Sequence, residues 1–431
     1  MIKLNKKILC IILLLFFLPF DIFSSSYYYE SLENDEKIIY NDIYKSLIKK
    51  EEYLEVGNID FDLLSKIYFF VLNDYPALFY VSETLNYSSS LLEDKLISAK
   101  IIFNYKDIDD ISINKKQEEL NSILDKIEQD VVGYSDFEIV KYVYDYLINN
   151  SYYDQNFRDQ SLLSILLDNI GLCTSYAKSF KFIMDHFDIE CLLVEGKFVN
   201  QEESHVWNMV KLDDSWYHVD VTQGDATNRF VDYSYLCITD KQIQKDHIIL
   251  SNVTLPKANA TSYFYLKNRG AYFTSFDKQK VENGIDKYIE NNENIFILSF
   301  ENSLSFKQAK QYLIDENGFS KILLINGYQS NVINYYENDL NNTLIIINEK
   351  KMIPIDIIYF KQYSISILKN KIKEVYKSGN KTFNLLFDQK EDYNSAIKYL
   401  FDEKNIFNII EDINSIDMIY YQDVFRIDFE I

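Results

Sequence analysis

Several residue types are scarce in this chain of 431 residues. It contains four prolines, ten glycines, four cysteines, four histidines and two tryptophans. With so few glycines and prolines, its turns must rely largely on Asn, Asp and Ser. Hydrophobic residues make up 47% of the chain and aromatic residues 16%, which indicates a globular fold and excludes extensive disorder. The length exceeds what one ordinary core requires, so two or three domains are expected.

Positive charge is also in short supply. The chain has 44 Lys and Arg residues against 66 Asp and Glu residues, which gives a formal net charge of −22. Such a surface repels phosphate backbones, so nucleic-acid binding is disfavoured. It resists anionic lipid headgroups for the same reason. The acidic balance mainly indicates solubility, and no partner is inferred from it.

Residues 1–25 have the layout of a secretory signal. Three lysines in the first seven residues precede an apolar run over residues 8–20 and a small-residue stretch over residues 24–26. The apolar run is short for a membrane-spanning helix, which favours cleavage over a permanent anchor. We therefore expect an exported protein of the periplasm, cell envelope or extracellular space. It would touch a membrane only through this segment, if the segment is not cleaved.

Three cysteines remain beyond that segment: Cys173, Cys191 and Cys237. An odd number in an exported protein leaves at least one free thiol. Cys191 and Cys237 stand in apolar settings, ECLLVEG and YLCITD. We interpret both as buried thiols that act as small hydrophobic residues, in preference to a disulfide.

Periodicity divides the first 250 residues into two regions. Residues 27–130 predict a mixed α/β region, with amphipathic helices, strand-like stretches at 77–81 and 96–105, and a long charged helix at its end. Residues 131–250 predict a second region that begins with a capping box, Ser135 followed three residues later by Glu138.

Within the second region, helices are predicted after Ser135, in SLLSILLDN with Gly171 at its end, and in TSYAKSFKFIMDHF. Strands are predicted in ECLLVEGKF, HVWNMVKL and SWYHVDVT. The pair Asp213-Asp214 between the last two strands predicts a short hairpin connection. The elements together indicate an α+β fold.

The C-terminal part contains an internal repeat. NIFILSF and FKQAKQYLIDE recur as KTFNLLF and YNSAIKYLFDE at an ungapped offset of 87 positions, as from Phe296 to Phe383. Further strands are expected in KILLING and TLIIINE of the first copy and in FNIIED and DVFRIDFEI of the second. We expect small α/β modules at residues 291–350 and 370–431, after a core extension or linker at 251–290. Phosphate loops and metal spacings are absent from them, which indicates a structural or binding appendage.

One group of residues has the make-up of a thiol nucleophile and its base. Cys173 follows Gly171-Leu172 and opens an amphipathic helix, where the helix dipole favours a thiolate. Its backbone N–H would point outward, as an oxyanion donor must. The two-residue period of a strand places His205 and Trp207 on one face, and a rigid strand suits a base.

The next strand supplies a candidate to orient that base. Asp220 lies between apolar neighbours in HVDVT, and a carboxylate in such a setting is seldom left without a partner. Taken singly, Cys173, His205 and Asp220 are each better explained as ordinary structural residues. Taken together, in the order helix, strand, strand, they predict a nucleophile, a base and an orienting carboxylate. His218 shares a face with Asp220 but ranks below His205 as the base.

The other two histidines and the two tryptophans are interpreted more simply. His186 and His247 lie outside these segments and are expected at the surface. Trp207 and Trp216 are expected to pack beside the site and keep it dry, although either could line a substrate groove.

The segments GLCTSYAKSFKFIMDHFDIECLLVEG, SHVWNMVKL and SWYHVDVT resemble the core motifs of the bacterial transglutaminase-like superfamily. The resemblance implies a papain-like core in which the helix carrying the cysteine packs on an antiparallel sheet. It implies Cys173 as nucleophile, His205 as base and Asp220 as orienter, with no metal or organic cofactor. It also suggests Tyr153 as an oxyanion donor, with Tyr152 or simple packing as the alternatives. Weaker similarity extends over about residues 60 to 290.

The chain departs from the family pattern at two places. Ser175 stands where the family often has glycine, and Gln223-Gly224-Asp225 replaces the usual tryptophan and aspartate after the threonine. We therefore expect different substrate contacts there.

The implied activity is acyl transfer through a thioester. The substrate would be a protein or peptide, with a cell-wall peptide as one option, attacked at a peptide bond or a glutamine side-chain amide. Water would give hydrolysis and an amine would give a cross-link, and the sequence does not choose between them. An inactive scaffold or binding protein of the cell envelope is the main alternative, and an acyltransferase with a small thioester donor is another.

Overall fold

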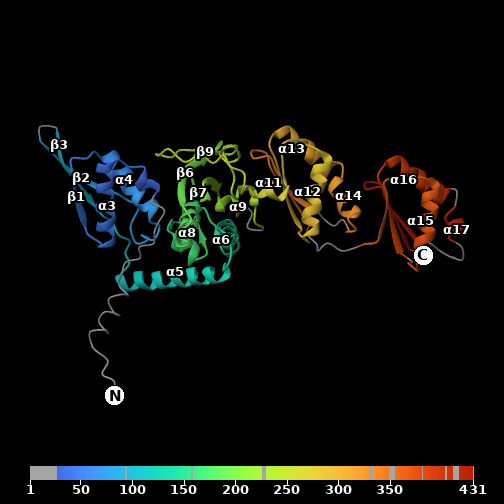
Figure 1. The fold of residues 1–431 in the computed structure, drawn as a ribbon, viewed down its shortest axis with the longest axis horizontal. Coiled ribbons are helices and arrows are strands. Elements are labelled where there is room, and N and C mark those ends of the chain that lie inside the picture. The colour runs from blue at the N-terminus through green and yellow to red at the C-terminus, as the bar shows by residue number, and fades with distance from the viewer. Residues whose placement is uncertain are drawn as a thin grey trace, which may run out of the picture. The chain divides into compact units, whose positions relative to one another are not determined.

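The computed structural model describes residues 27–430 apart from 93–94, 157–158, 226–229, 330–332, 349–354, 381, 403–404 and 411–416. The expected export signal at residues 1–25 lies outside the described residues. The chain divides into two compact units, Met1–Tyr265 and Leu266–Ile431 (Figure 1). In the described part, none of the helices is both long enough and apolar enough to cross a bilayer.

The N-terminal region of the first unit combines helices with a small antiparallel sheet. Its elements are α2 (Tyr27–Glu30), α3 (Asn34–Ile48), β1 (Tyr53–Gly57), α4 (Phe61–Asp74), β2 (Asn86–Leu92), β3 (Lys95–Ile102) and α5 (Asp110–Asp130), with the strands in the order β1-β3-β2. Asp60 begins α4 by accepting a hydrogen bond from the Leu63 amide at 2.9 Å. The strand expected at residues 77–81 is wrong: these residues form turns, and only Val81 makes an isolated bridge, to Tyr105.

The core region places a helix against an antiparallel sheet, as expected. Its helices are α6 (Asp136–Asn150), α7 (Leu162–Leu166), α8 (Cys173–His186), α9 (Val221–Gly224), the 3₁₀ turn η2 (Tyr233–Tyr235) and α10 (Asp240–Ile243). The sheet has the order β8-β7-β6-β9, formed by Ser215–Val219, Ser204–Leu212, Cys191–Phe198 and His247–Ile249. The predicted capping box at Ser135 and Glu138 is confirmed.

Helix α8 is held by an apolar stripe that faces α6, α7 and the sheet strands β6 and β7. Tyr176, Phe180, Ile183 and Met184 are fully buried along it. The polar residues Ser179, Lys181 and Asp185 are buried as well, so α8 is enclosed on all sides and the expected amphipathic helix with an exposed polar face is wrong. Gly171 does not end the preceding helix. It lies in β5 (Ile170–Gly171), which pairs in parallel with β4 (Tyr152–Tyr153) immediately before α8.

The second unit consists of two modules with the same topology. After α11 (Tyr265–Arg269), the first contains β10 (Tyr272–Phe273), α12 (Lys278–Glu290), β11 (Ile295–Phe300), α13 (Ser303–Lys310), α14 (Gly318–Ile325), β12 (Ile333–Asn338) and β13 (Thr343–Asn348). The second contains β14 (Ile357–Phe360), α15 (Ile365–Lys377), β15 (Thr382–Phe387), α16 (Lys390–Ile397), α17 (Ile406–Ile409), β16 (Asp417–Tyr421) and β17 (Arg426–Glu430). The sheet orders are β10-β11-β13-β12 and β14-β15-β17-β16.

The repeat is real but its expected details need correction. β10 pairs with β11 and β14 pairs with β15, both in parallel, so each module begins before the expected starts at residues 291 and 370. KILLING falls in α14 and the turn after it, and the described part of FNIIED overlaps α17, so neither is a strand. Short apolar runs of this kind do not distinguish a buried strand from a buried helix.

Candidate active site

Cys173 is the first residue of α8. Its neighbour Leu172 caps the helix without a side-chain hydrogen bond, and the thiol is partly exposed. The amide of a first helical residue has no partner within the helix, so it remains available to a ligand. A glycine precedes the site because a Cβ at Gly171 would lie 2.7 Å from the Ser164 hydroxyl oxygen. Cys173 therefore presents both a thiol and an amide at the positive end of a helix dipole.

His205 and Asp220 meet in the sheet beside Cys173. The His205 Nε2 atom lies 2.6 Å from Asp220 Oδ2. Asp220 follows β8 and begins α9, where its Oδ1 accepts a hydrogen bond from the Gln223 amide at 3.0 Å. Because Asp220 accepts from Nε2, the other ring nitrogen is left to face the thiol. The charge of His205 acts on the Cys173 thiol, which places the imidazole near the sulfur. The structure thus brings together the three residues that the sequence grouped.

The pKa values of the three groups shift in mutually supporting directions. Burial raises the pKa of Cys173, but the hydrogen bond and charge of His205 and the amide of Val206 outweigh it and lower that pKa. Burial lowers the pKa of His205, but Asp220 outweighs this effect, so the pKa is raised. Burial likewise raises the pKa of Asp220, but His205 outweighs it and holds that pKa well below its usual range. The geometry supports a thiolate–imidazolium pair.

Aromatic rings enclose the imidazole. Trp207 stacks on His205 with ring centroids 5.8 Å apart, and the centroid of the Phe198 ring lies 4.4 Å from that of His205. Trp207 is only 1% exposed, so it packs against the site and does not line a groove. Trp216 is half-buried and makes an edge contact with Tyr27 at 5.7 Å. Trp207 therefore has the first of the two expected roles, whereas the role of Trp216 beside the site stays a prediction.

The four histidines occupy very different places. His218 is fully buried, accepts from the Trp207 indole N–H through Nδ1 at 3.1 Å, and places Nε2 2.9 Å from Asp240. Both of its ring nitrogens therefore have partners other than the thiol. This position agrees with the prediction that His205, and not His218, is the base. His186 is half-buried at the end of α8. The surface position expected for His247 is wrong, because this residue is 2% exposed and contacts Asp220.

Tyr153 lies close to the thiol and Tyr152 points elsewhere. Tyr153 pairs with Gly171, two residues before Cys173, and is 39% exposed. Its pKa is raised by burial and then by the charges of Cys173 and Asp220, which places its hydroxyl near both. Tyr152 is 63% exposed. The oxyanion role of Tyr153 stays a prediction.

The two departures from the family pattern are both structural contacts. The Ser175 hydroxyl donates to the Asp159 carbonyl at 3.1 Å. Tyr176 donates its hydroxyl proton to Asp225, which fixes the segment after Asp220 against α8. A Cβ at Gly224 would lie 2.1 Å from the Tyr144 hydroxyl oxygen, so only glycine fits there.

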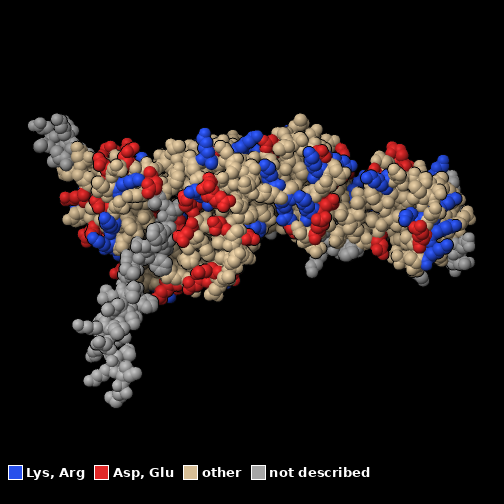
Figure 2. Space-filling view, in the orientation of Figure 1, with Lys and Arg blue, Asp and Glu red and all other residues tan. Residues whose placement is uncertain are grey.

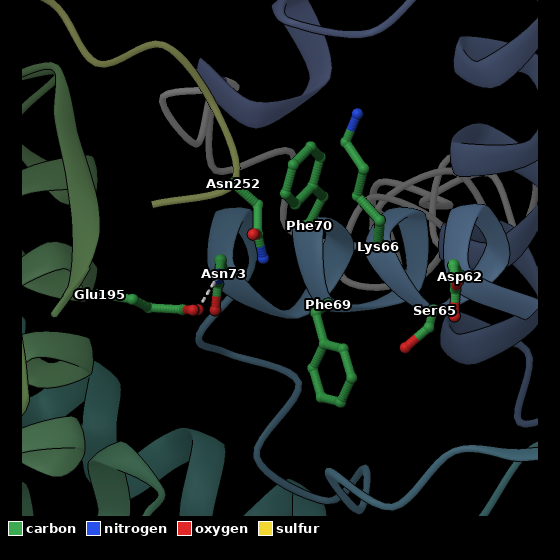
Figure 3. A pocket seen from close by; sticks show the side chains of 8 residues that line it. All are labelled: Asp62, Ser65, Lys66, Phe69, Phe70, Asn73, Glu195 and Asn252. Carbon is green, nitrogen blue, oxygen red and sulfur yellow. Dashed lines mark hydrogen bonds between the residues drawn. The ribbon is translucent and has the colours of Figure 1, made fainter. Parts of the chain in front are cut away.

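A cleft leads away from the site. One hollow of about 230 Å³ is lined by Thr174, His205 and Val206 near the thiol and by Phe69, Asn73 and Glu195 further out. The last three residues also line a larger hollow of about 660 Å³ along α4 (Figure 3). In that figure Asn73 and Glu195 bridge the two sides of the cleft through a 3.3 Å hydrogen bond. The two hollows thus form a cleft between α4 and β6, and His205 and Thr174, the residue after Cys173, line its smaller end.

Three side chains near the thiol have atoms spaced closely enough to surround a metal ion. One atom each of His205, Asp220 and His247 lies within 4.8 Å of the others. Both imidazoles already face Asp220 Oδ2 at hydrogen-bonding distances of 2.6 and 3.1 Å. A metal ion would have to displace both contacts, so the arrangement is better described as a hydrogen-bonded chain.

Gly196 provides a test of how tightly this region is packed. A Cβ there would lie 2.3 Å from the Ile248 carbonyl oxygen and 2.7 Å from the Trp207 ring. We expect Gly196→Ala to lower the free energy of unfolding by about 1–3 kcal/mol because either β9 or Trp207 must move. Thermal unfolding measures the effect, with Lys197→Ala on the same strand as the control. An alanine variant as stable as the wild type would contradict this packing.

Comparison with known proteins agrees with the geometry. Residues 126–221 match the transglutaminase-like superfamily. A solved structure described as a TGase is 15% identical, with a TM-score of 0.24, and the match covers 32% of this chain and 44% of that one, less than half its length. A protein from Cytophaga hutchinsonii described as a candidate cysteine protease is 9% identical, with a TM-score of 0.23, over 42% of this chain and 81% of that one. No curated protein matches the chain.

Proposed function

For a transglutaminase-like protein whose residues 126–221 carry the family's core, we propose acyl transfer through a thioester on Cys173. The core would be papain-like. The observation that supports this most strongly is that His205 Nε2 lies 2.6 Å from a buried Asp220, while the charge of the same ring acts on the Cys173 thiol. A buried ion pair of this kind is expensive to maintain unless the site uses it.

The reaction would follow from the positions of these groups. The Cys173 thiolate attacks an amide carbonyl carbon, and negative charge develops on the carbonyl oxygen near the Cys173 amide and the Tyr153 hydroxyl. His205 gives its proton to the leaving nitrogen as the C–N bond breaks, which leaves a thioester and a neutral imidazole. Asp220 holds the ring and stabilises its charged form.

The second half of the reaction would reverse these roles. Neutral His205 takes a proton from water or from an amine as that nucleophile attacks the thioester carbonyl. The carbon–sulfur bond then breaks and the thiolate is restored beside an imidazolium. Water gives a carboxylic acid, whereas an amine gives a new amide. The cycle balances with these groups alone.

The substrate is proposed to be a protein or peptide, with a cell-wall peptide as one option, bound outside the cell. The cleft between α4 and β6 is open and of mixed polarity, which suits an extended segment of chain. On the face shown in Figure 2, Lys and Arg side chains are interspersed with Asp and Glu and do not form one continuous basic surface. Nucleic acid is therefore a poor candidate.

Phe69 is the residue in the cleft whose removal should affect binding most selectively. It is 37% exposed and lines both hollows. We expect Phe69→Ala to raise KM about tenfold, because an apolar contact with the substrate is lost, and to leave kcat almost unchanged. The control is Phe61→Ala, an exposed phenylalanine of the same helix that packs on Tyr87. Equal effects of the two substitutions on KM would contradict the assignment of the cleft.

One experiment separates the possible activities. The protein, without residues 1–25, is incubated with a dansylated amine and a protein mixture, beside a Cys173→Ala variant. Dye incorporation that depends on Cys173 indicates transamidation, and Cys173-dependent peptide fragments indicate hydrolysis. If neither appears, the acyl-transfer proposal is wrong and a binding role takes its place.

A further inference from the structure

Asp220 contacts a second imidazole that the proposed reaction does not use. His247 Nε2 lies 3.1 Å from Asp220 Oδ2, the same oxygen that faces His205. The other nitrogen of His247, Nδ1, lies 2.6 Å from Asp246 Oδ1. Asp246 Oδ2 in turn accepts the hydroxyl proton of Tyr235 at 2.6 Å. A hydrogen-bonded chain thus extends from His205, beside the thiol, through Asp220, His247 and Asp246 to Tyr235.

Besides His205, this sheet buries two histidines, His218 and His247, whose partners favour opposite protonation states. The indole N–H of Trp207 can only donate, so His218 Nδ1 must accept and its ring is neutral. Burial is the leading cause that keeps the pKa of His218 lowered. His247 instead faces a carboxylate at each nitrogen, so both nitrogens carry protons. Burial lowers the pKa of His247, but Asp220 and Asp246 outweigh it and raise that pKa.

An ordinary core histidine would not need this arrangement. One hydrogen bond to a backbone carbonyl satisfies a neutral imidazole, whereas His247, Asp220 and Asp246 place three charged groups in a region that is at most 3% exposed. Burying charge is costly unless each group is paired. His247 is paired with Asp220, the carboxylate that orients His205. His247 is therefore connected to the site and does more than pack β9 against the sheet.

We infer that His247 is a positioning residue for the Cys173 site: as a buried imidazolium it fixes the Asp220 carboxylate and offsets part of its charge. This inference rests on the proposed function. Asp220 with both neighbours charged pulls less strongly on the His205 proton than an uncompensated carboxylate would. His205 can then release its proton to the leaving nitrogen more readily. If Asp220 held that proton too strongly, this proton transfer would be slow.

Several titratable groups surround His247, and each affects its charge. They are Asp220 at the start of α9, Asp246 beside it, His205 on β7, His218 on β8 and Tyr235 of η2. The nonpolar rings of Phe198 and Trp207 complete the enclosure. Apart from His205 itself, none of these described groups is a cation that could replace His247 beside Asp220.

The test is the pH profile of Cys173 alkylation by iodoacetamide in His247→Gln, compared with His218→Gln. The upper step of the profile reports deprotonation of His205. Loss of the His247 charge should move that step upward by about one pH unit or more, because an opposing charge has gone from a buried site. His218→Gln removes a neutral ring from the same sheet and should leave the step in place. If both variants behave alike, His247 has only a structural role and the inference fails.

A second measurement does not depend on a variant folding. Heteronuclear NMR of the histidine ring nitrogens in the wild-type protein should show both nitrogens of His247 protonated at neutral pH and only one nitrogen of His218 protonated. A neutral His247 would overturn the inference. A different result would contradict the proposed function: alkylation of wild-type Cys173 that begins only at the pH where ordinary thiols ionise.

Discussion

Asparagine in place of Asp220 is expected to reduce turnover by about ten-thousandfold. The carboxylate holds the proton of His205 on Nε2, which leaves the other ring nitrogen for the thiol. An amide at this position can present its N–H to the ring and thereby favour the wrong tautomer. It also removes the charge that stabilises the imidazolium, so the pKa of His205 falls. The loss is measured as the steady-state turnover of a protein substrate that the dansylated-amine experiment identifies.

The same substitution should destabilise the fold in a pH-dependent way. The pKa of Asp220 is lowered in the folded protein, so its ionised form stabilises the fold above the unfolded value near ~4. That contribution is lost as the pH falls through the folded pKa. Asp220→Asn should therefore cost about 3–5 kcal/mol at neutral pH and progressively less in strong acid. Denaturant unfolding at several pH values measures this difference.

The control for both effects is Asp225→Asn. Asp225 is also buried, lies five positions further along the chain and bonds Tyr176 in place of a histidine. Burial raises the pKa of Asp225 to about 6, so its ionised form destabilises the fold at neutral pH, the opposite sign to Asp220. A loss of turnover in Asp225→Asn as large as that in Asp220→Asn would contradict a special role for Asp220.

Glutamine in place of His205 is expected to abolish turnover, with a loss of about a million-fold. It should also change the chemistry of the thiol itself. The hydrogen bond and charge of His205 oppose the effect of burial on Cys173. Without them, the midpoint of the pH dependence of alkylation should move up to the ordinary thiol range near ~8.5 or above it.

The matched control for this substitution is His218→Gln. His218 lies in the adjacent strand and is equally buried, but bonds Trp207 and Asp240 and not the thiol. Its glutamine variant should retain the wild-type midpoint for Cys173. A His205→Gln variant that also retains that midpoint would show that another group activates the thiol.

Much of the candidate site could be predicted because its parts lie in short segments with strong local patterns. Cys173 opens a helix after a glycine, His205 stands in an apolar strand, and Asp220 directly follows the next strand, which the Asp213-Asp214 hairpin joins to the first. Local periodicity fixes which face each side chain takes. Their convergence was inferred from the combination and from the family resemblance, and the structure places His205 within hydrogen-bonding distance of Asp220 and close to Cys173.

His247 could not be found in the same way. It lies on β9, a strand of only three residues, and pairs with β6 across about fifty positions of chain. Such a contact depends on tertiary packing and leaves no local period. The available signal was its setting in DHIIL, where an acidic residue precedes the histidine and three apolar residues follow it. That pattern is compatible with burial but is too short to indicate it.

The helices α14 and α17 were missed for a different reason. GFSKILLI contains a run of apolar residues that fits a buried strand as well as a buried helix. The repeat offset of 87 positions did reveal the modules. In the structure the same offset also relates α12 to α15, which begin at Lys278 and Ile365. Sequence identity between those helices is too low to show the correspondence.

The most direct test of the account is the pH dependence of iodoacetamide alkylation at each cysteine of the native protein, followed by peptide mass spectrometry. Cys173 should be alkylated with a midpoint below the ordinary thiol range. Cys191 and Cys237 are fully buried, burial raises the pKa of both, and they should react only after unfolding. A Cys173 that reacts at mildly acidic pH no faster than in the urea-unfolded chain would contradict an activated thiolate at this site.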